Sequence, residues 1–308
     1  PHKAFTLDCS GRAGVLARAL RVREPNSRTV ALCATWHCAE GWDVPDASHT
    51  LIEAYADGWA WSVPVSPHER CVAFMVDPGG ARYECELAKT REFRRIFAKG
   101  TPGEPWTCDA SLYTSSRFCG DDFLLVGDAG SFVDPLSSFG VRKAMLSGWM
   151  AAVVVNTCLR RPEMRQTALD YFDAHEKQVY ADCKRRAAEL FREASAEFAR
   201  PFWERRAEEP EPSGAASVLE RLKAQSSIRL IPAVKDGRVL GIEGREVVLL
   251  DRIEGVNLPR LVEIAPLHTQ VPDLFEAYNR AFPPVALPAF LIALATLLAR
   301  GILVNRDV

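Results

Sequence analysis

The part of the chain best suited to chemistry is a Gly-Asp pair that follows an apolar run. Residues 123–126 are apolar, Gly127 and Asp128 come directly after them, and Gly130 follows. A carboxylate at the point where a strand gives way to a loop can accept hydrogen bonds from the hydroxyls of a sugar-like chain. Glycine allows the backbone to approach a ligand closely. The pattern therefore predicts a ligand-binding turn at the end of a buried strand.

The residues that follow predict the entrance to a helix. Asp134 and Pro135 form an Asp-Pro turn, Phe139 and Gly140 come next, and a long apolar segment begins at Val141. The first N–H groups of a helix have no partner within the helix and lie at the positive end of its dipole. Such groups favour an electron-rich ring or an anion.

Two further segments could line a binding site. Near the start of the chain, residues 5–8 have the composition of a strand and run into Asp-Cys-Ser-Gly-Arg, which ends at Arg12. Trp59 and Trp61 are two residues apart in a segment that reaches Pro64. Because alternate residues of a strand share a face, both indoles point the same way. They can wall a pocket for an aromatic substrate, or they can be core residues of a half-buried strand.

These three segments resemble motifs of FAD-dependent monooxygenases and flavin-dependent halogenases. The Gly-Asp segment resembles their second flavin-binding signature, and the segment ending at Arg12 resembles one that passes the diphosphate of the cofactor. The Trp pair resembles the Trp-x-Trp-x-Ile-Pro motif of the halogenases, with Val63 in place of Ile. The resemblance covers residues 1–205. It implies an α/β fold, in which an α+β substrate sheet rests on an FAD-binding domain of the aromatic-hydroxylase type.

The resemblance also implies the cofactor and its contacts. FAD would be bound, O₂ would be a co-substrate, and chloride or bromide would be a further substrate of a halogenase. Asp128 would hold the ribityl chain, and the turn from the Asp-Pro pair to Gly140 would lie against the isoalloxazine. The implied cofactor-binding residues are Arg12, Gly127, Asp128, Asp134, Pro135, Phe139 and Gly140.

One motif of these families is missing. They bind the adenine nucleotide through Gly-x-Gly-x-x-Gly, which does not occur in this chain, and the sequence begins at Pro1 without an initiator Met. We therefore expect a preceding segment of about 100–150 residues, which would contain this motif and the catalytic Lys of the halogenases. If the chain is instead complete, it would bind partners without catalysis.

The turn before Gly140 bears on the type of reaction. Free tryptophan halogenases have a Glu directly before the Ser of this turn, whereas this chain has Ser137 before Ser138. The missing carboxylate favours hydroxylation of an organic, aromatic substrate as the first hypothesis. The alternative is a halogenase that acts on a phenolic, pyrrolic, carrier-bound or peptide-bound substrate. The backbone N–H groups of Phe139 and Gly140 remain available to a halide in either case.

Three residues near the expected substrate sheet are candidates for acid–base catalysis. His37 and His49 lie on or beside it, and histidine titrates near neutral pH. Glu53 lies on the strand before the Trp pair. A histidine on a strand can equally be a hydrogen-bonded structural residue.

The composition is typical of a globular enzyme. The chain has 308 residues, 48% of them hydrophobic, and a formal net charge of −2, which does not indicate a nucleic-acid partner. The cysteines include no Cys-x-x-Cys pair, so we expect no metal site and reduced thiols in a cytoplasmic protein. The apolar run at 285–299 is too short for a transmembrane segment. A flavin reductase is a candidate partner.

The hydrophobic pattern predicts two domains joined by a linker. Residues 1–207 would form the partial FAD-binding and substrate domain, 208–216 a Pro-rich linker, and 217–308 a small winged-helix-like module. Helices are expected at 88–98, 141–159, 165–205, 259–266, 271–281 and 287–299. Strands are expected at 28–37, 49–55, 59–65, 70–76, 107–114, 122–126 and in three short runs after 228.

Overall fold

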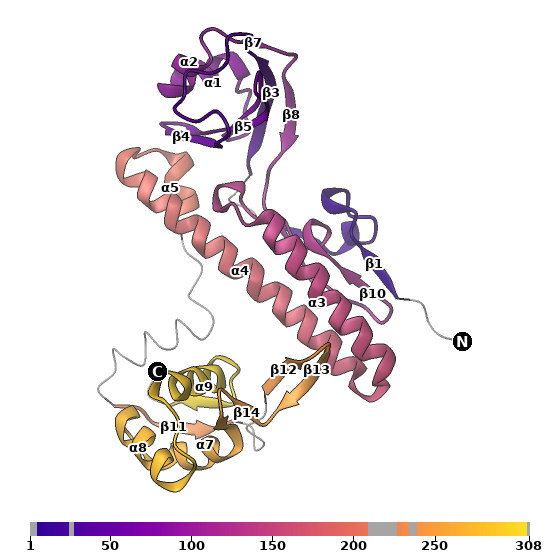
Figure 1. The fold of residues 1–308 in the computed structure, drawn as a ribbon, viewed down its shortest axis with the longest axis vertical. Coiled ribbons are helices and arrows are strands. Elements are labelled where there is room, and N and C mark those ends of the chain that lie inside the picture. The colour runs from indigo at the N-terminus through magenta and orange to yellow at the C-terminus, as the bar shows by residue number, and fades with distance from the viewer. Residues whose placement is uncertain (1–4, 25–27, 209–226, 234–238, 307–308) are drawn as a thin grey trace. The chain divides into compact units, whose positions relative to one another are not determined.

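The chain folds into two compact units, shown in the computed structural model of Figure 1, which describes residues 5–24, 28–208, 227–233 and 239–306. The first unit contains Pro1–Ser147 and Val179–Pro210, and the second contains Gly148–Gln178 and Glu211–Val308. The expected division at a linker differs from this one, because 148–178 groups with the C-terminal segment. Beyond Glu208, the expected linker lies outside the described residues.

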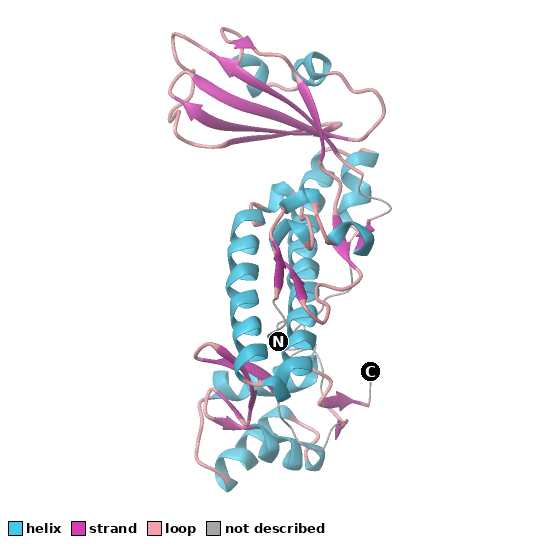
Figure 2. Ribbon diagram, turned by 90° about the vertical axis from the view of Figure 1, so that its right-hand side faces the viewer, coloured by secondary structure: helices cyan, strands magenta, loops and turns pink. Residues whose placement is uncertain are grey.

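An antiparallel six-stranded sheet forms one end of the first unit (Figure 2). Four of its strands run in the order β4-β5-β6-β3, with β7 and β8 both paired to β3. A tight turn joins β4 to β5, because Tyr55 pairs with Gly58. The strands are β3 (Val30–His37), β4 (Leu51–Tyr55), β5 (Gly58–Ser66), β6 (Glu69–Val76), β7 (Thr101–Pro102) and β8 (Trp106–Asp109).

Each face of this sheet packs against helices, as the alternation of side chains requires. One face packs against α1 (Tyr83–Lys89) and α2 (Glu92–Ile96), which replace the single helix expected at 88–98. The other face packs against residues of α4 (Arg165–Glu197) and α5 (Pro201–Ala207). The second face supplies Ala31, Cys33, Trp59, Ala73 and Met75, and the helices supply Ala187, Phe191, Phe202 and Trp203.

The expected helix at 165–205 is wrong at its C-terminal end. Helix α4 ends at Glu197, and α5 begins at Pro201. Proline lacks an N–H group and disfavours helical backbone in the residue before it. Accordingly, Arg200 is extended, with φ −135° and ψ 148°.

A short parallel pair joins a strand near the start of the chain to one much further along it: β1 (Thr6–Asp8) pairs with β10 (Phe123–Leu125). Beside it in the sequence, β2 (Arg21–Arg23) pairs antiparallel with β9 (Tyr113–Ser115). Helix α3 (Gly140–Arg160) begins in the first unit, which contains it as far as Ser147. This α3 matches the helix expected at 141–159.

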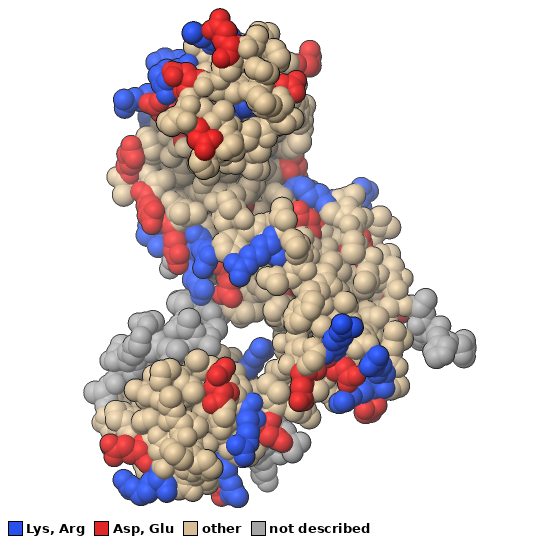
Figure 3. Space-filling view, viewed as in Figure 1, with Lys and Arg blue, Asp and Glu red and all other residues tan. Residues whose placement is uncertain are grey.

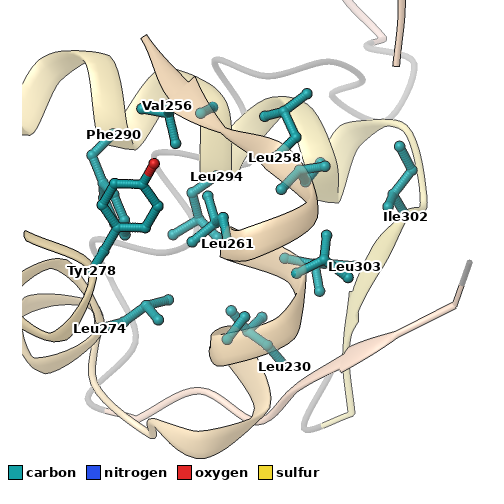
Figure 4. Packing of buried hydrophobic residues seen from close by; sticks show 14 of the residues in the cluster. Leu230, Val256, Leu258, Leu261, Leu274, Tyr278, Phe290, Leu294, Ile302 and Leu303 are labelled. Carbon is teal, nitrogen blue, oxygen red and sulfur yellow. The ribbon is translucent and has the colours of Figure 1, made fainter. Parts of the chain in front are cut away.

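The C-terminal segment has its own core. Helices α7 (Leu258–Ile264), α8 (Val271–Ala281) and α9 (Leu287–Ala299) follow the strands β11 (Leu230–Pro232), β12 (Val239–Glu243), β13 (Glu246–Leu250), β14 (Arg252–Ile253) and β15 (Val256–Asn257). The final strand, β16 (Leu303–Asn305), pairs with β11. Leu261, Leu294, Tyr278 and Phe290 converge between the helices (Figure 4).

The order of these elements bears on the winged-helix prediction. The three expected helices are present, but the hairpin β12–β13 precedes them, and only β16 follows them among the described residues. A winged-helix module therefore stays a prediction. Acidic and basic side chains are interspersed on the face shown in Figure 3. Across the described ranges, no helix is both long and apolar enough to cross a bilayer.

Candidate cofactor site

The parallel pairing of β1 and β10 brings the two predicted flavin segments together. Asp8 is opposite Leu125, and the N–H of Val126 donates to the Asp8 carbonyl at 3.0 Å. The loop at Gly11–Ala13 and the turn at Gly127–Ala129 follow these strands and pack against each other. Both segments therefore leave the carboxyl edge of one sheet, which is where ligands bind in open α/β folds.

Asp8 organises the first loop. Its buried carboxylate accepts hydrogen bonds from the N–H groups of Ser10 (3.1 Å), Leu16 (2.7 Å) and Ala17 (3.3 Å), and from the Ser10 hydroxyl. Burial acts to raise the pKa of Asp8, but these hydrogen bonds outweigh it and lower the pKa below its usual value. Asp8 is thus an ionised structural residue that sequence reasoning did not single out.

Arg12 presents a partly unsatisfied guanidinium beside this loop. Its guanidinium carbon lies 3.9 Å from the centre of the Phe132 ring, and Nη2 lies 4.0 Å from a carboxylate oxygen of Asp109. Arg21 lies over the Tyr113 ring at 3.9 Å and donates to the Arg12 carbonyl at 2.9 Å. Nη1 of Arg12 is buried and has no hydrogen-bond partner among the described residues. A buried donor without a partner is suited to an anionic ligand such as a diphosphate.

Asp128 is held in place by an ion pair with a buried lysine, Lys143. The side chain of Lys143 is 1% exposed, and its Nζ donates to the Gly127 carbonyl at 3.2 Å and to the Ser131 hydroxyl at 3.1 Å. Nζ lies 3.4 Å from Oδ1 of Asp128, which forms an ion pair but is too long for a strong hydrogen bond. The Asp128 side chain remains 32% exposed, so its carboxylate can accept a hydrogen bond from a ligand hydroxyl.

Gly127 allows α3 to come close to this turn. Its φ is +61°, and a Cβ there would lie 3.0 Å from the Ala144 side chain. The Ser147 hydroxyl accepts a hydrogen bond from the Gly127 N–H at 3.1 Å. Sequence reasoning missed Lys143, although a lysine inside an apolar helix is a usable signal of a buried partner.

The turn before α3 has a rigid base and an open end. The buried Asp134 accepts a hydrogen bond from the Leu136 N–H at 3.0 Å and caps the helical turn Pro135–Ser137. Burial raises the pKa of Asp134 to about 6, against the opposing effects of the Leu136 N–H and Arg206. A Cβ on Gly140 would meet nothing within 4 Å, so the start of α3 is open to a ligand.

Two arginine side chains lie near the Phe139 ring at this end of the turn. Its ring centre lies 5.5 Å from the guanidinium carbon of Arg142 and 4.6 Å from that of Arg186. The first turn of α3 contains no acidic residue. Taken together, the open helix start, the accessible Asp128 carboxylate and the unsatisfied Arg12 donor fit FAD, whose flat ring, hydroxyl chain and diphosphate have matching chemistry.

The Trp pair lies on one face, as expected, but mostly within the core. Trp59 is 2% exposed and packs in the cluster that α4 and α5 cover, and Trp61 packs partly buried against it. Leu136, from the turn before α3, packs against the same cluster. Pro64 alternates to the opposite face of β5, with Ser62, so it does not lie on the Trp face. A role for Trp61 in substrate binding stays a prediction.

The three acid–base candidates have contacts within the sheet and its surroundings. The Glu53 carboxylate accepts from the N–H groups of Arg91 (2.6 Å), Glu92 (3.1 Å) and Phe93 (2.8 Å), so it caps α2. His37 is exposed at the end of β3, and the exposed His49 pairs with Asp46 at 3.1 Å. None of these contacts involves the Gly-Asp turn. No cluster of ligands that could hold a metal ion occurs in the parts of the chain that the structure describes.

Known proteins identify the family. The family model "Tryptophan halogenase" matches residues 2–237. A tryptophan 2-halogenase from Chondromyces crocatus is 26% identical over 187 residues, and the flavin-dependent halogenase armH4 from Armillaria mellea is 26% identical over 208. These matches cover 54% and 57% of this chain. The chain spans only 35% and 38% of the lengths of these two relatives.

Solved structures show the same fold. The flavin-dependent halogenase CmlS superimposes with a TM-score of 0.72 at 17% identity, over 98% of this chain and 68% of its own. The peptidyl tryptophan dihydroxylase QhpG gives a TM-score of 0.65 at 23% identity, over 94% of this chain and 67% of its own. Since the family model covers most of the sequence, the chain belongs to the tryptophan halogenase family of flavin-dependent oxidoreductases.

Proposed function

We propose that this chain forms the flavin-contacting and substrate-side part of a flavin-dependent halogenase. The observation that carries the proposal is the pairing of β1 with β10, which places the Arg12 loop beside the Gly127-Asp128 turn at one sheet edge. Curated relatives of this chain are halogenases, which supports halogenation over our first hypothesis, hydroxylation.

Each group at the site has a separate task. Asp128, held by the buried Lys143, accepts a ribityl hydroxyl and fixes the cofactor along the turn. Arg12 offers its unsatisfied donor to the diphosphate. The N–H groups of Phe139 and Gly140 bind a halide at the open start of α3, where the dipole and nearby arginines favour an anion. When bound and reduced, FAD supplies with O₂ the oxidising power that converts halide into an electrophile.

The substrate class follows from the residue before Ser138. Ser137 stands where free tryptophan halogenases have a Glu, so this position offers no carboxylate to a free indole. Its buried hydroxyl donates to the Asp134 carbonyl at 2.7 Å. We infer an electron-rich aromatic substrate, either a small phenol or pyrrole or a group tethered to a carrier or peptide. A flavin reductase is the proposed source of reduced flavin.

The proposal is tested on the natural protein that contains this chain, supplied with reduced FAD and O₂. Phenol, pyrrole and indole serve as acceptors, each with bromide, with chloride and in halide-free buffer. We expect a product with the bromine or chlorine isotope pattern only when the matching halide is present. A gain of one oxygen in halide-free buffer, with no halogenated product, would establish hydroxylation instead.

Hydroxylation is retained as the second candidate because of Ser137 and because QhpG, a dihydroxylase, has the same fold. A partner-binding role without catalysis is the third candidate. Visible absorption separates it from the others, since a protein that never retains flavin when purified with excess FAD would support binding alone.

A further inference from the structure

Tyr113 lies between the two segments that form the candidate cofactor site. It is the first residue of β9, which pairs with β2 directly after the Arg12 loop. It also forms an antiparallel bridge with Phe132, which follows the Gly-Asp turn, and the Phe132 N–H donates to the Tyr113 carbonyl at 2.9 Å. Tyr113 is 2% exposed. A single buried residue therefore contacts the chain that continues from each of the two segments.

The Tyr113 hydroxyl holds the backbone of the Gly-Asp turn. It donates to the Asp128 carbonyl at 2.6 Å, which is short for a bond between a hydroxyl and a carbonyl. Burial raises the pKa of Tyr113, although Arg21 and Arg12 act in the opposite direction, so the hydroxyl remains a donor at neutral pH. Asp128 is therefore held at two points, by Tyr113 at its carbonyl and by Lys143 at its carboxylate.

The Tyr113 ring contacts the arginine side chains beside the first loop. The guanidinium carbons of Arg21 and Arg12 lie 3.9 Å and 5.5 Å from the centre of the ring. The ring stacks on Phe132 with centres 6.0 Å apart and planes inclined by 23°, and Phe132 contacts Arg12 at 3.9 Å. An aromatic face attracts a cation through its quadrupole. The two rings therefore hold both guanidinium groups in place.

Arg21 connects this contact to the backbone of the loop. Its Nη2 donates to the Arg12 carbonyl at 2.9 Å, and a Cβ on Gly14 would lie 2.7 Å from the same atom. Nε of Arg21 is buried and, like Nη1 of Arg12, has no hydrogen-bond partner among the described residues. The loop therefore packs closely against an arginine that the Tyr113 ring holds.

We propose that Tyr113 is a positioning residue of the cofactor site, which fixes the Asp128 turn through its hydroxyl and the Arg12 loop through its ring. This inference rests on the proposed function, which assigns the turn to the ribityl chain of FAD and the loop to the diphosphate. The hydroxyl and the ring of one side chain thus act on different parts of the cofactor. Their separate removal should have separable effects on flavin binding.

The test compares FAD with riboflavin, which has the same ring system and ribityl chain but no diphosphate. Flavin fluorescence quenching gives each Kd for the natural protein that contains this chain. Tyr113→Phe removes only the hydroxyl and should raise the Kd of both flavins about twofold to tenfold, as expected for one neutral hydrogen bond. Tyr113→Leu also removes the ring, so it should raise the Kd of FAD several times more than that of riboflavin.

A mutant cycle separates positioning from a general loss of stability. In an Asp128→Ala background, Tyr113→Phe should leave the Kd of riboflavin almost unchanged, because the hydroxyl acts through Asp128. Tyr83→Phe is the matched control. Tyr83 is also buried, and its hydroxyl accepts from the Trp36 indole at 2.7 Å, but it packs in the cluster under α1 and α2. This control should lower the Tm and leave both Kd values unchanged.

Three results would overturn the inference. They are a lower Tm of Tyr113→Phe with both Kd values unchanged, an equal effect of Tyr113→Phe in both backgrounds, and an equal rise of the two Kd values in Tyr113→Leu. If Tyr113→Leu does not fold, Arg21→Gln, at a half-buried residue, replaces it and should also weaken FAD more than riboflavin. If the unaltered protein binds neither flavin, the proposed function fails, and this inference fails with it.

Discussion

Buried charge is the main theme at the scale of single residues. Lys143 and Asp128 form an ion pair in which only the carboxylate is exposed to solvent. The Asp8 carboxylate, in contrast, accepts hydrogen bonds from its own loop. Asp134 is the contrasting case, since burial favours its neutral form. Asp8, Asp128 and Asp134 thus have three different roles, each set by the groups around its carboxyl.

Asp128→Ala should weaken FAD binding. The change removes an acceptor for a ribityl hydroxyl, and a hydrogen bond to a charged group is typically worth about 1.5–3 kcal/mol, or roughly a tenfold to hundredfold change in Kd. Flavin fluorescence quenching measures the Kd. Asp128→Asn keeps the size of the side chain, and Asp43→Ala, at an exposed ion pair with Arg95, is the control. A folded Asp128→Ala variant with unchanged Kd would contradict the assignment.

Asp134→Asn should stabilise the protein above pH 6 but not below pH 4. The folded pKa of about 6 exceeds the ordinary value of 3.8, so the native carboxyl favours folding while it is protonated, and this contribution is lost as pH rises through 6. Asparagine still accepts from Leu136 but cannot ionise. Urea unfolding of both proteins at pH 4 and pH 8 should show a relative gain on the order of 2 kcal/mol at pH 8. Equal differences at the two pH values would refute a buried, neutral-favouring site.

At the scale of elements, the sequence pattern predicted strands and helices correctly where a single periodicity of apolar residues was present. Alternation located β3 to β6, and the apolar helix after Gly140 was found within one residue at each end. The break at Pro201 was missed because the helical spacing of apolar residues continues to Phe198 and conceals it. The two-residue strands β14 and β15 are too short for any periodicity to reveal.

The motifs of the candidate site could be predicted from the sequence, but the hydrogen-bond and ion-pair partners of its side chains could not. Gly127-Asp128 and the Arg12 loop follow strands, and the parallel pairing of those strands brings them together as the resemblance implied. The role of Glu53 was not predictable, because its partners, the N–H groups of α2, lie some forty residues further along the chain. Lys143 itself could have been noticed in the apolar helix, but the sequence does not show that its partners are Gly127 and Ser131, which precede it by 16 and 12 residues.

Glu53→Ala should lower stability without affecting flavin binding. The variant leaves the first N–H groups of α2 without their acceptor, and losing a helix cap typically costs about 0.5–2 kcal/mol. Thermal unfolding should show a lower Tm for Glu53→Ala, and the Tm of Glu53→Gln should lie between those of Glu53→Ala and the unaltered protein. Glu40→Ala, which removes an exposed partner of Lys99, is the control. Were Glu53→Gln to lose turnover at an unchanged Tm, the acid–base prediction would be preferred.

Trp59→Ala should be far more destabilising than Trp61→Ala. Truncating a buried aromatic residue costs about 3–5 kcal/mol, and Trp59 is 2% exposed whereas Trp61 is only partly covered. Urea unfolding measures the difference, with Trp59→Phe as the conservative control. In a functional enzyme, a loss of turnover in Trp61→Ala beyond its loss of stability would support a role at the substrate. Equal destabilisation by both variants would place the two indoles equally in the core.

At the scale of the whole molecule, the residues that we propose to bind the cofactor all belong to the first unit. The second unit has a separate core in which Leu261, Leu294 and Tyr278 are buried. We therefore expect Leu294→Ala to destabilise that unit by about 2–5 kcal/mol while the Kd for FAD stays unchanged. Hydrogen exchange of α7 to α9 would report the destabilisation. A matching rise in the FAD Kd would show that the units are energetically coupled.

The uneven placement of indoles gives these units distinct optical signatures. Six of the seven tryptophans lie in the first unit, and Trp149 is the exception. Trp149 is 54% exposed, so its emission should be red-shifted and easily quenched by iodide, unlike that of Trp59 or Trp203. A Trp149→Phe variant would leave the second unit with tyrosine as its brightest chromophore. Excitation at the red edge of the absorption band would then follow the first unit alone, while circular dichroism would follow both.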